Sequence, residues 1–583
     1  MKFDLKKKNM SPLYILKRIN NHLDIKRKRQ VILIFILSIF SSLSESISIV
    51  LLIPFISVFI SPDMYLFNSL FQNIFDYLNI SDQKDVFLFV SILFISTVAM
   101  SGVIRVMYIK ASNNLTEKIT SDFRIKIFNF LINQDYSYYF KHGTNEIMSS
   151  LTQKTGSFTV IVFATMNIIN AILILIAIIC VLTINEPFYT MIIILVISLF
   201  FAVIYKIKSR AVLKKGQNVN LNQNIIVDTF ENTVGYLQEV LVYNLKNFFL
   251  STLKKVSTEI AKSSSEIRTI EMTPKIYLET FIIIFVVLLV YFLNLTERSL
   301  LLNISHLAVL AYGAQKCLPL VNSLYNLSIR FKASTPTVLS FLEILDKKKE
   351  PYSTTENEGS EILKFDKEIN LKKIFFQYNK TLPPVLNNLN LIIKKGEKIA
   401  IKGKTGTGKS TLINLILGLI EPTQGKILID GIEINSTNKK NWQKNIAIVP
   451  QTIFLNNASI LENIALGENF NEINFEKVKN SAKISCISEF IESLPNKYKE
   501  KVGEKGIRLS GGQKQRIGLA RALYRNPNVL VLDEASNALD LKTENQVMEE
   551  LTSLSKKVTI IMISHSDHSL KFFDRIFNLD KIS

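Results

Sequence analysis

Residues 403–411 combine glycines, a lysine and adjacent hydroxyl side chains, a composition suited to holding phosphate groups. The segment reads Gly403, Lys404, Thr405, Gly406, Thr407, Gly408, Lys409, Ser410 and Thr411. Glycines let backbone N–H groups approach an anion, and a helix following Lys409 would favour negative charge at its N-terminus. Lys409 would contact the β- and γ-phosphates of a nucleotide, and the Ser410 hydroxyl would bind Mg²⁺. This segment alone can match by chance, so the later motifs decide its meaning.

A second segment, residues 529–534, ends in two adjacent acidic residues that could act on a bound nucleotide. Residues 529–532 predict a buried parallel strand that runs directly into Asp533 and Glu534. Asp533 would hold the metal ion, and Glu534 would act as the general base on the attacking water. The alternative is acids at a sheet edge that serve only solubility. It is disfavoured because the pair directly follows an apolar strand.

The pentapeptide Leu509-Ser510-Gly511-Gly512-Gln513 lies between these two segments. With it, the order of motifs resembles the ATP-binding cassette (ABC) family. The resemblance covers the whole chain as an exporter-type half-transporter, with one six-span domain followed by one cassette. It implies that Ser510, Gly511, Gly512 and Gln513 close over ATP held by a second copy of the chain. The implied partner is therefore a homodimer mate, and the implied cofactors are ATP and Mg²⁺.

The same resemblance gives roles to further residues. Tyr378 matches the aromatic residue that stacks on adenine, and Gln451 matches the glutamine that links the metal to the membrane domain. His565 matches the switch histidine near the γ-phosphate, although a lone histidine is more often structural. Residues 503–506 and 536–540 resemble, respectively, an exporter-specific loop and a loop that contacts the partner cassette.

Alternating strand and helix patterns must position these segments. Helices are expected after Lys409, Ser510 and Thr543. Strand signals cover residues 391–393, 398–401, 446–449, 529–532 and 558–563. This pattern predicts a parallel α/β sheet with a mixed front part.

Six apolar runs in the first part of the chain are long enough to cross a bilayer of roughly 30 Å. They cover about 31–60, 86–109, 158–184, 188–206, 275–295 and 300–327. The expected fold class is an α-helical membrane domain, with long cytoplasmic extensions, plus an α/β P-loop ABC ATPase domain. The expected domains are a basic lead at 1–30, a membrane domain at 31–340, a polar linker at 341–368 and a nucleotide-binding domain at 369–583.

The distribution of Lys and Arg predicts how the chain is oriented. These residues crowd the lead at 1–30 and the connections at 110–157 and 207–274, whereas the other connections are short or acidic. By the positive-inside rule both termini are then cytoplasmic. The expected location is the cytoplasmic (inner) membrane of a bacterium, as the resemblance to bacterial flippases described below implies. The net charge of +20 does not indicate a nucleic-acid partner, because the lysines flank apolar runs. The three cysteines and five histidines show no metal-ligand spacing.

Two features bear on what is carried. Fusion of spans and cassette in one chain resembles exporters, and residues 135–143 and 235–243 resemble their coupling helices. Residues 67–79 alternate apolar and polar side chains at helical spacing. They predict an amphipathic helix, lying either at the outer membrane interface or packed on its own protein.

Three charged residues fall inside expected spans, namely Glu45, Arg105 and Lys316. Such charges cost about 2.5–3.5 kcal/mol each at mid-span and usually mark function. The two cations would suit an anionic headgroup such as a pyrophosphate, or they would snorkel to the interface. With Pro54, Pro319 and the outer helix, they resemble bacterial flippases of lipid-linked oligosaccharides. That resemblance implies a lipid-linked anionic substrate. Lipid A-type, drug or peptide export and an ATP-gated channel or sensor remain open.

Overall fold

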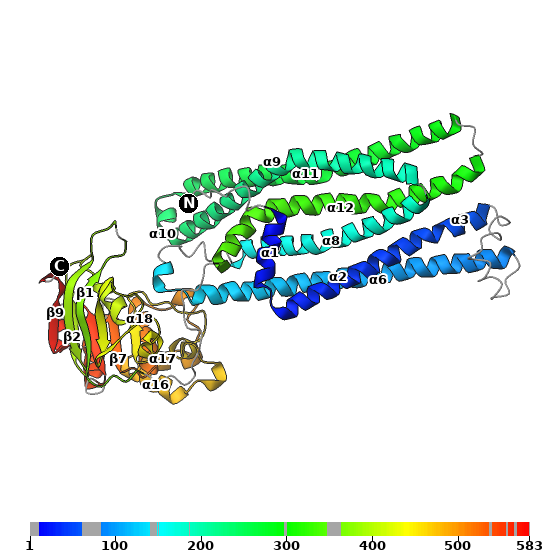
Figure 1. Cartoon of the computed structure of the whole chain (residues 1–583). Helices are drawn as coiled ribbons and strands as arrows, with labels where there is room; N and C mark the ends of the chain where they lie inside the picture. The colour runs from blue at the N-terminus through cyan, green and yellow to red at the C-terminus, as the bar shows by residue number, and fades with distance from the viewer. Residues whose placement is uncertain are drawn as a thin grey trace. The chain divides into compact units, whose positions relative to one another are not determined.

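The computed structural model describes most of the chain (Figure 1). The described residues are 11–60, 83–139, 149, 151–185, 187–295, 300–346, 363–379, 381–535, 539–554, 558–564 and 568–581. They fall into two compact units. Unit 1 comprises Met1–Gln134 and His142–Lys348, and unit 2 comprises Asp135–Lys141 and Lys349–Ser583. The amphipathic helix expected at 67–79 lies outside the described residues.

Unit 1 is helical throughout its described residues. Its helices are α1 (Pro12–His22), α2 (Ile25–Val50), α3 (Leu52–Ile60), α6 (Gln83–Ile132), α8 (Gln153–Asn185), α9 (Pro187–Gly235), α10 (Leu237–Val242), α11 (Lys246–Leu295) and α12 (Leu300–Asp346). The longest has 50 residues and is about 75 Å long at 1.5 Å per residue. Because a hydrocarbon core is only about 30 Å thick, such a helix extends far beyond it.

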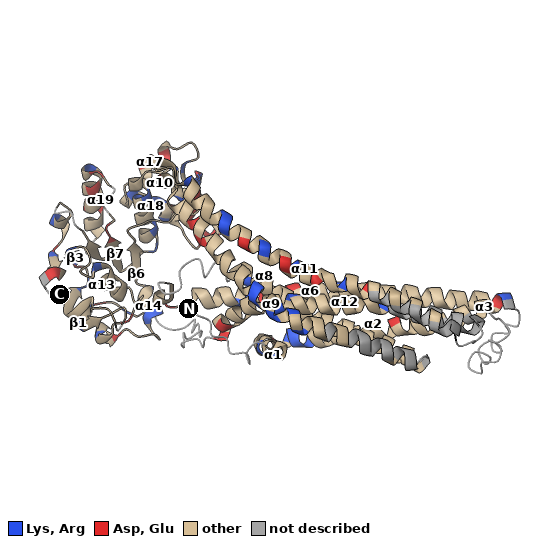
Figure 2. Cartoon of the chain, turned by 90° about the horizontal axis from the view of Figure 1, so that it is seen from above, with Lys and Arg blue, Asp and Glu red and all other residues tan. Residues whose placement is uncertain are grey.

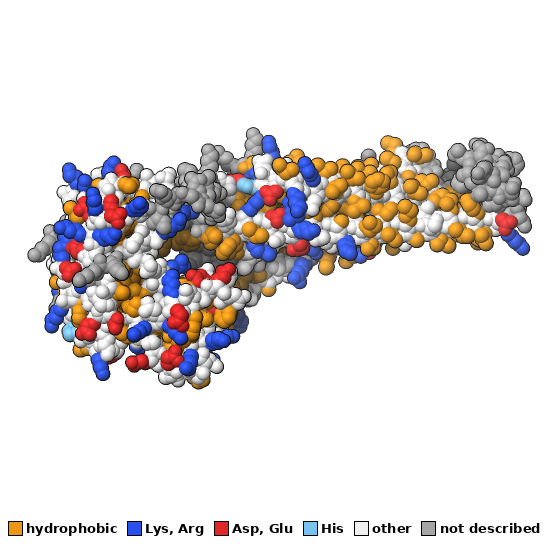
Figure 3. Space-filling model, turned by 90° about the horizontal axis from the view of Figure 1, so that it is seen from below, with side chains coloured by type: hydrophobic (Ala, Val, Ile, Leu, Met, Phe, Trp, Pro, Cys, Tyr) orange, Lys and Arg blue, Asp and Glu red, His pale blue; other side chains and the backbone are white. Residues whose placement is uncertain are grey.

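The apolar character of unit 1 is concentrated along part of its length. Three helical segments among the described residues are long and apolar enough to cross a membrane, namely Ile25–Ile56, Lys84–Ile132 and Gln153–Ile184. The other three expected runs fall within α9, α11 and α12. Hydrophobic side chains cover a long stretch of the unit's surface, with charged side chains gathered beyond it (Figure 3; charges also in Figure 2). This distribution is typical of helices that pass through a lipid bilayer.

The first expected span, at 31–60, is not one continuous helix. It is divided between α2 and α3, with Leu51 at a turn. Ser46 and Ser48 donate hydrogen bonds back to carbonyls one turn earlier, which weakens the regular ladder. Pro54 has no N–H and cannot donate to the carbonyl of Val50. The break at Leu51 therefore lies in the turn that Pro54 disrupts, directly after the turns with the serine hydrogen bonds.

Unit 2 contains two sheets. The strands are β1 (Glu368–Phe376), β2 (Leu386–Lys394), β3 (Lys398–Lys402), β4 (Gln424–Ile429), β5 (Ile432–Glu433), β6 (Ile446–Val449), β7 (Val529–Asp533), β8 (Thr559–Ile563) and β9 (Arg575–Asn578). One sheet has the order β2-β1-β4-β5 with antiparallel pairs, and the other has the order β6-β7-β8-β3-β9 with parallel pairs. The expected parallel α/β sheet with a mixed front part is thus confirmed.

Helices and side chains fill the space beside these sheets. The α-helices of unit 2 are α13 (Lys409–Ile416), α14 (Lys439–Gln443), α15 (Ile460–Ile464), α16 (Phe475–Ile484), α17 (Ser488–Ser493), α18 (Gly511–Tyr524) and α19 (Leu541–Leu554). Trp442 is fully buried, and its indole N–H donates to the carbonyl of Ile416 at 2.8 Å. It is the only tryptophan in the chain, so intrinsic fluorescence reports on unit 2 alone.

One glycine of the antiparallel sheet is required by a close approach of two strands. Gly425 has φ +92°, and a Cβ there would lie 2.3 Å from the carbonyl oxygen of Lys373. Replacing Gly425 by alanine should destabilise unit 2 by more than about 3 kcal/mol, because the left-handed backbone and a displaced strand both cost free energy. The measurement is the midpoint of thermal unfolding of the full chain, followed by Trp442 fluorescence.

Gly431 provides the matched control. It has φ +89°, but nothing lies within 4 Å of the position its Cβ would take. Gly431→Ala should therefore cost only the backbone term, about 1–2 kcal/mol. Equal shifts of the two midpoints would show that the contact with β1 does not matter.

Candidate functional site

The parallel sheet gathers the sequence-predicted residues at one edge. Gly403 follows β3, Gln451 follows β6, and Asp533 is the last residue of β7. These strands are parallel members of one sheet, so their carboxyl ends face the same side. Crevices at the carboxyl ends of parallel strands are where open α/β sheets bind ligands. Residues that are far apart in sequence are therefore brought together by the strand order.

Residues 403–411, which we call the phosphate loop, lead from β3 into α13. Gly408 caps α13 with φ +92°, and a Cβ there would lie 2.9 Å from the Val385 side chain, so glycine fits where a larger residue would not. Lys409 is 7% exposed, and its ammonium donates to the carbonyls of Gly403 (2.7 Å) and Lys404 (2.9 Å). The lysine therefore lies across its own loop, beside the backbone that would surround a phosphate. Ser410 is exposed in the first turn of α13.

The two acids have different environments. Burial raises the pKa of Asp533 above its usual value, Glu534 raises it further, and the Lys409 ammonium partly opposes both. Glu534 has φ +52°, a left-handed conformation that is costly for a residue with a side chain and that clusters at functional sites. Its backbone N–H donates to the carbonyl of Ile563 at 3.2 Å, which fixes it against the end of β8.

Gln451 contacts the expected general base directly. Its side-chain N–H donates to Oε2 of Glu534 at 2.8 Å. Pro450 and Gln451 continue from β6, which pairs with β7 in parallel register from Ile446 opposite Val529. Because the amide donates, Oε2 of Glu534 is held as an acceptor at the end of β7.

Tyr378 lies beside the first turn of α13. Its hydroxyl is 3.1 Å from the Thr411 hydroxyl, and its ring packs edge-on against Phe376. The side chain is 47% exposed, so part of the ring is accessible to a ligand. An accessible aromatic surface next to a phosphate-binding loop suits the stacking of a nucleotide base.

The pentapeptide forms the start of α18. Ser510 accepts from the backbone N–H of Gln513 at 3.2 Å, and the Gln513 side chain accepts from the N–H of Ser510 at 2.9 Å. This reciprocal capping box fixes the helix end. Ser510 and Gly511 are exposed, while Gly512 and Gln513 are half-buried. An exposed N-terminus of a 14-residue helix favours an anion.

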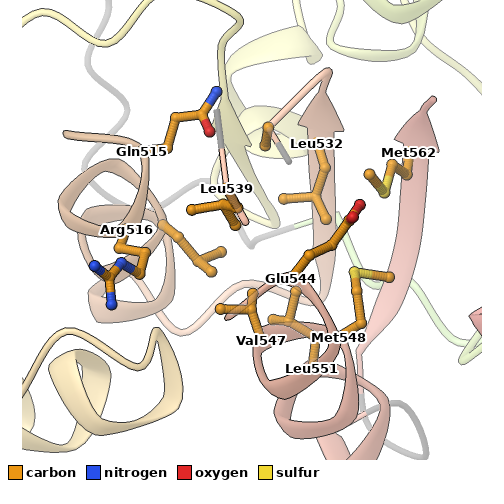
Figure 4. A pocket seen from close by; sticks show the side chains of 11 residues that line it. Gln515, Arg516, Leu532, Leu539, Glu544, Val547, Met548, Leu551 and Met562 are labelled. Carbon is orange, nitrogen blue, oxygen red and sulfur yellow. The ribbon is translucent and has the colours of Figure 1, made fainter. Parts of the chain in front are cut away.

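His565 and residues 536–538 of the expected dimer-contact loop lie outside the described residues. The segment after His565, at residues 568–569, is held by two residues of α19 that the sequence did not single out. Ser569 donates to the buried Glu544 carboxylate at 2.5 Å, and His568 is 2.7 Å from the Asn545 side chain. Glu544 lies among mostly apolar side chains of α18, β7, β8 and α19 (Figure 4). An acid in the first turn of α19 was the only sequence signal for this residue.

The structure joins two of the three charged residues of the expected spans. The Lys316 ammonium on α12 donates to Oε1 of Glu45 on α2 at 2.7 Å, and the Glu45 side chain is 7% exposed. Arg105 lies on α6 and is exposed. Lys316 is therefore charge-matched inside the helices, and Arg105 is not part of that pair. This arrangement favours a structural role for Lys316.

The first expected coupling segment begins within unit 2. The Lys439 ammonium, on a side chain that is 5% exposed, donates to Oδ1 of Asp135 at 2.9 Å. Residues 140–148 lie outside the described part. The second expected segment, 235–243, contains the short helix α10 of unit 1.

Comparisons with known proteins agree with this geometry. Residues 386–537 match the family described as ABC transporter. The chain is 39% identical over 224 residues to ABC transporter B family member 29 of Arabidopsis thaliana, covering 38% of this chain and 35% of that protein. It is 38% identical over 242 residues to the ATP-dependent lipid A-core flippase of Saccharophagus degradans, covering 41% and 40%. Each match thus spans less than half of the relative's own length.

One solved structure matches nearly the whole chain. It is a bacterial Atm1-family ABC exporter with ATP bound, with a TM-score of 0.75 and 20% identity, covering 95% of this chain and 93% of that one. The chain therefore has the fold of an ABC exporter, with a helical amino-terminal domain and a carboxy-terminal α/β domain. Residues 386–537, which match the family described as ABC transporter, lie in that second domain.

Proposed function

We propose that the protein is a homodimeric ABC exporter that hydrolyses ATP to move an amphipathic lipid-linked substrate, a lipid-linked oligosaccharide, across the cytoplasmic membrane of a bacterium. The contact of Gln451 with Glu534 is the observation that carries the ATPase part of the proposal. It lies at the sheet edge where the phosphate loop begins. The phosphate loop, Asp533 and Glu534 all lie at the carboxyl ends of strands of this sheet, which supports the roles proposed for them. The exporter fold and the apolar helices carry the membrane part.

ATP and Mg²⁺ fit the residues present. Mg²⁺ is commonly held by one or two protein oxygens plus substrate phosphates, so a large cluster of acids is not needed. Burial raises the pKa of Asp533, so a nearby cation would stabilise its charged carboxylate. The Ser410 hydroxyl and the Gln451 side-chain oxygen are further candidate ligands. The cation would neutralise phosphate charge. Lys409 would orient the phosphates, Tyr378 would hold the base, and Glu534 would accept the proton of the attacking water.

The exposed start of the pentapeptide 509–513, called the signature below, supports the proposal that a second copy completes each ATP site. Ser510 and Gly511 present an anion-favouring helix end to solvent. In a homodimer each signature would cover the nucleotide held by the other phosphate loop. ATP would then favour the closed pair and hydrolysis would release it, because a ligand shifts an equilibrium toward the state that it binds more tightly. The His565 switch role stays a prediction within this scheme.

The lipid-linked substrate is the finer part of the proposal. A lipid A-core flippase is among the relatives, and so are a multidrug resistance protein and a leukotoxin export protein. The lipid-linked oligosaccharide favoured by the sequence shares a negatively charged headgroup and a long apolar tail with lipid A. Drug or peptide export is the second candidate.

Reconstitution tests this choice. The purified chain in liposomes should translocate a fluorescent lipid-linked oligosaccharide pyrophosphate only when ATP and Mg²⁺ are present, and the same lipid should stimulate its ATPase activity. A lipid A and a cationic drug serve as competing cargoes under identical conditions. Translocation of the drug with no movement of either glycolipid would overturn the lipid-linked assignment but not the ATPase assignment.

A further inference from the structure

A pocket between α11 and α12 is lined by two polar stripes of matched spacing. Three residues of α11, Glu271, Lys275 and Glu279, recur every four residues and therefore lie on one face of the helix. The α12 side is formed by Asn322, Asn326 and Arg330 at the same spacing. The pocket has a volume of about 410 Å³, and leucine side chains and Pro319 form its apolar lining. Neither Lys316 nor Arg105 lines it.

The two asparagines leave hydrogen-bonding capacity unused in this pocket. Within the described part of the chain, the side-chain oxygens of Asn322 and Asn326 are buried and accept no hydrogen bond. Leaving a buried acceptor unsatisfied is destabilising, and such groups in native proteins call for an explanation. A ligand that donates hydroxyl or N–H groups would satisfy both oxygens.

The charged residues of the pocket pair with one another, but their cations remain partly exposed to solvent. Arg330 donates through Nε to Oε1 of Glu271 at 2.5 Å, but its side chain is 58% exposed, while the Glu271 side chain is only 10% exposed. Lys275 lies 3.7 Å from Glu279, and both are about half exposed. The cations therefore have donors facing the open side. The exposed pair Lys275–Glu279 contributes little to stability, so an anion can compete for Lys275.

Local chemistry explains why α11 and α12 are fixed to each other here. Pro274 has no N–H, so the carbonyl of Ile270 loses its helical partner. The Tyr325 hydroxyl of α12 donates to that carbonyl at 3.1 Å. This bond ties the two helices at the pocket wall. Pro319 likewise leaves the carbonyl of Gln315 without its helical donor, one turn before the pocket's first asparagine.

The position along the helices also suits a lipid headgroup. The apolar run of α11 begins near 275 and that of α12 ends near 327. The charged residues thus fall at the ends of the two expected spans, where they can reach water at low cost. The apolar lining lies toward the spans themselves. A molecule with a polar head and an apolar tail matches this division.

We propose that the α11–α12 pocket binds the phosphorylated sugar head of the lipid that is transported. This proposal rests on the proposed function and adds a binding site for its substrate. Arg330 and Lys275 bind phosphate oxygens, and sugar hydroxyls donate to the amide oxygens of Asn322 and Asn326. Glu271 holds the Arg330 guanidinium in place. Cation-only sites would suffice for phosphate, so the two amides select for a head that also carries hydroxyl donors.

Two sets of variants test the pocket in the full chain in lipid nanodiscs. Asn322→Leu with Asn326→Leu removes both acceptors at similar side-chain size, and Lys275→Gln removes one exposed cation. Arg268→Gln is the matched control, since Arg268 is an exposed cation of the same helix outside the pocket. Basal ATPase activity, which depends on unit 2, verifies that each variant is folded.

The probe is a fluorescent polyprenyl pyrophosphate carrying a sugar, with binding measured by anisotropy. The Asn pair should weaken binding at least about tenfold, a loss equivalent to about 1.4 kcal/mol. Lys275→Gln should weaken binding and reduce its dependence on salt, while Arg268→Gln should match the wild type. Wild-type affinity in both pocket variants would overturn the proposal. A sugar pyrophosphate without the lipid should bind much more weakly, and equal affinity would overturn the lipid part.

Failure of the pocket and failure of the transport proposal give different results. If the wild type translocates the lipid and the pocket variants translocate it equally well, only the pocket is wrong. If the wild type neither binds nor translocates any lipid-linked sugar phosphate, the substrate class is wrong and the pocket proposal falls with it.

Discussion

Replacing Glu534 by glutamine should reduce ATP turnover by about 10²–10⁴-fold while ATP binding persists. The glutamine side chain has the same length and can still meet Gln451, so the crevice keeps its shape. It cannot accept a proton, however, and the attacking water then lacks its base. The backbone of residue 534 already holds φ +52°, which glutamine adopts as readily as glutamate does. The effect is thus expected on chemistry and not on folding.

Phosphate release by the full chain in nanodiscs measures turnover, and a fluorescent ATP analogue measures binding. Glu549→Gln is the control, because Glu549 is an exposed acid on α19 away from the crevice. It should leave both quantities unchanged. Turnover of Glu534→Gln at the wild-type rate would remove Glu534 as the base, whereas loss of nucleotide binding would indicate a structural role.

The grouping of the candidate nucleotide-binding residues was predictable from the sequence because their motifs lie at strand ends. Once β3, β6 and β7 are recognised as parallel strands of one sheet, Gly403, Gln451 and Glu534 must lie along the same edge. The order of strands β6-β7-β8-β3 was not predictable from the motifs, yet any parallel order would have gathered them. The roles of Glu544 and Ser569 were not predicted, because their contact depends on how α19 packs on the segment after β8.

For the residues of the expected membrane spans, by contrast, the contacts could not be predicted from the sequence. Glu45 and Lys316 both lie inside apolar runs of the sequence. They are 271 positions apart, and nothing in the sequence predicts that their side chains form an ion pair. Pairing changes the interpretation of Lys316 from an available cation to one side of a buried ion pair. The stripes of the α11–α12 pocket repeat every four residues in the sequence. Their meaning depends on which helix faces are opposed, and only the folded chain shows that.

Dimer formation can be tested by placing two defects either on different chains or on the same chain. Lys409→Ala disables the phosphate loop, and Gly512→Asp puts bulk and negative charge at the exposed start of α18, where an anion should bind. All chains also carry Glu534→Gln, so that bound ATP is retained. Two affinity tags allow each mixed dimer to be purified, and retained ATP is counted per dimer.

The two arrangements contain the same substitutions and give opposite results. With Lys409→Ala on one chain and Gly512→Asp on the other, one composite site carries both defects and the other carries none, so the mixed dimer should retain one ATP. With both substitutions on one chain and neither on its partner, each composite site has one defect, and no ATP should be retained. If each site lay within a single chain, the first mixed dimer would retain none and the second would retain one. The exposed start of α18 at Ser510 and Gly511, which favours an anion, is the physical reason to expect the first pattern.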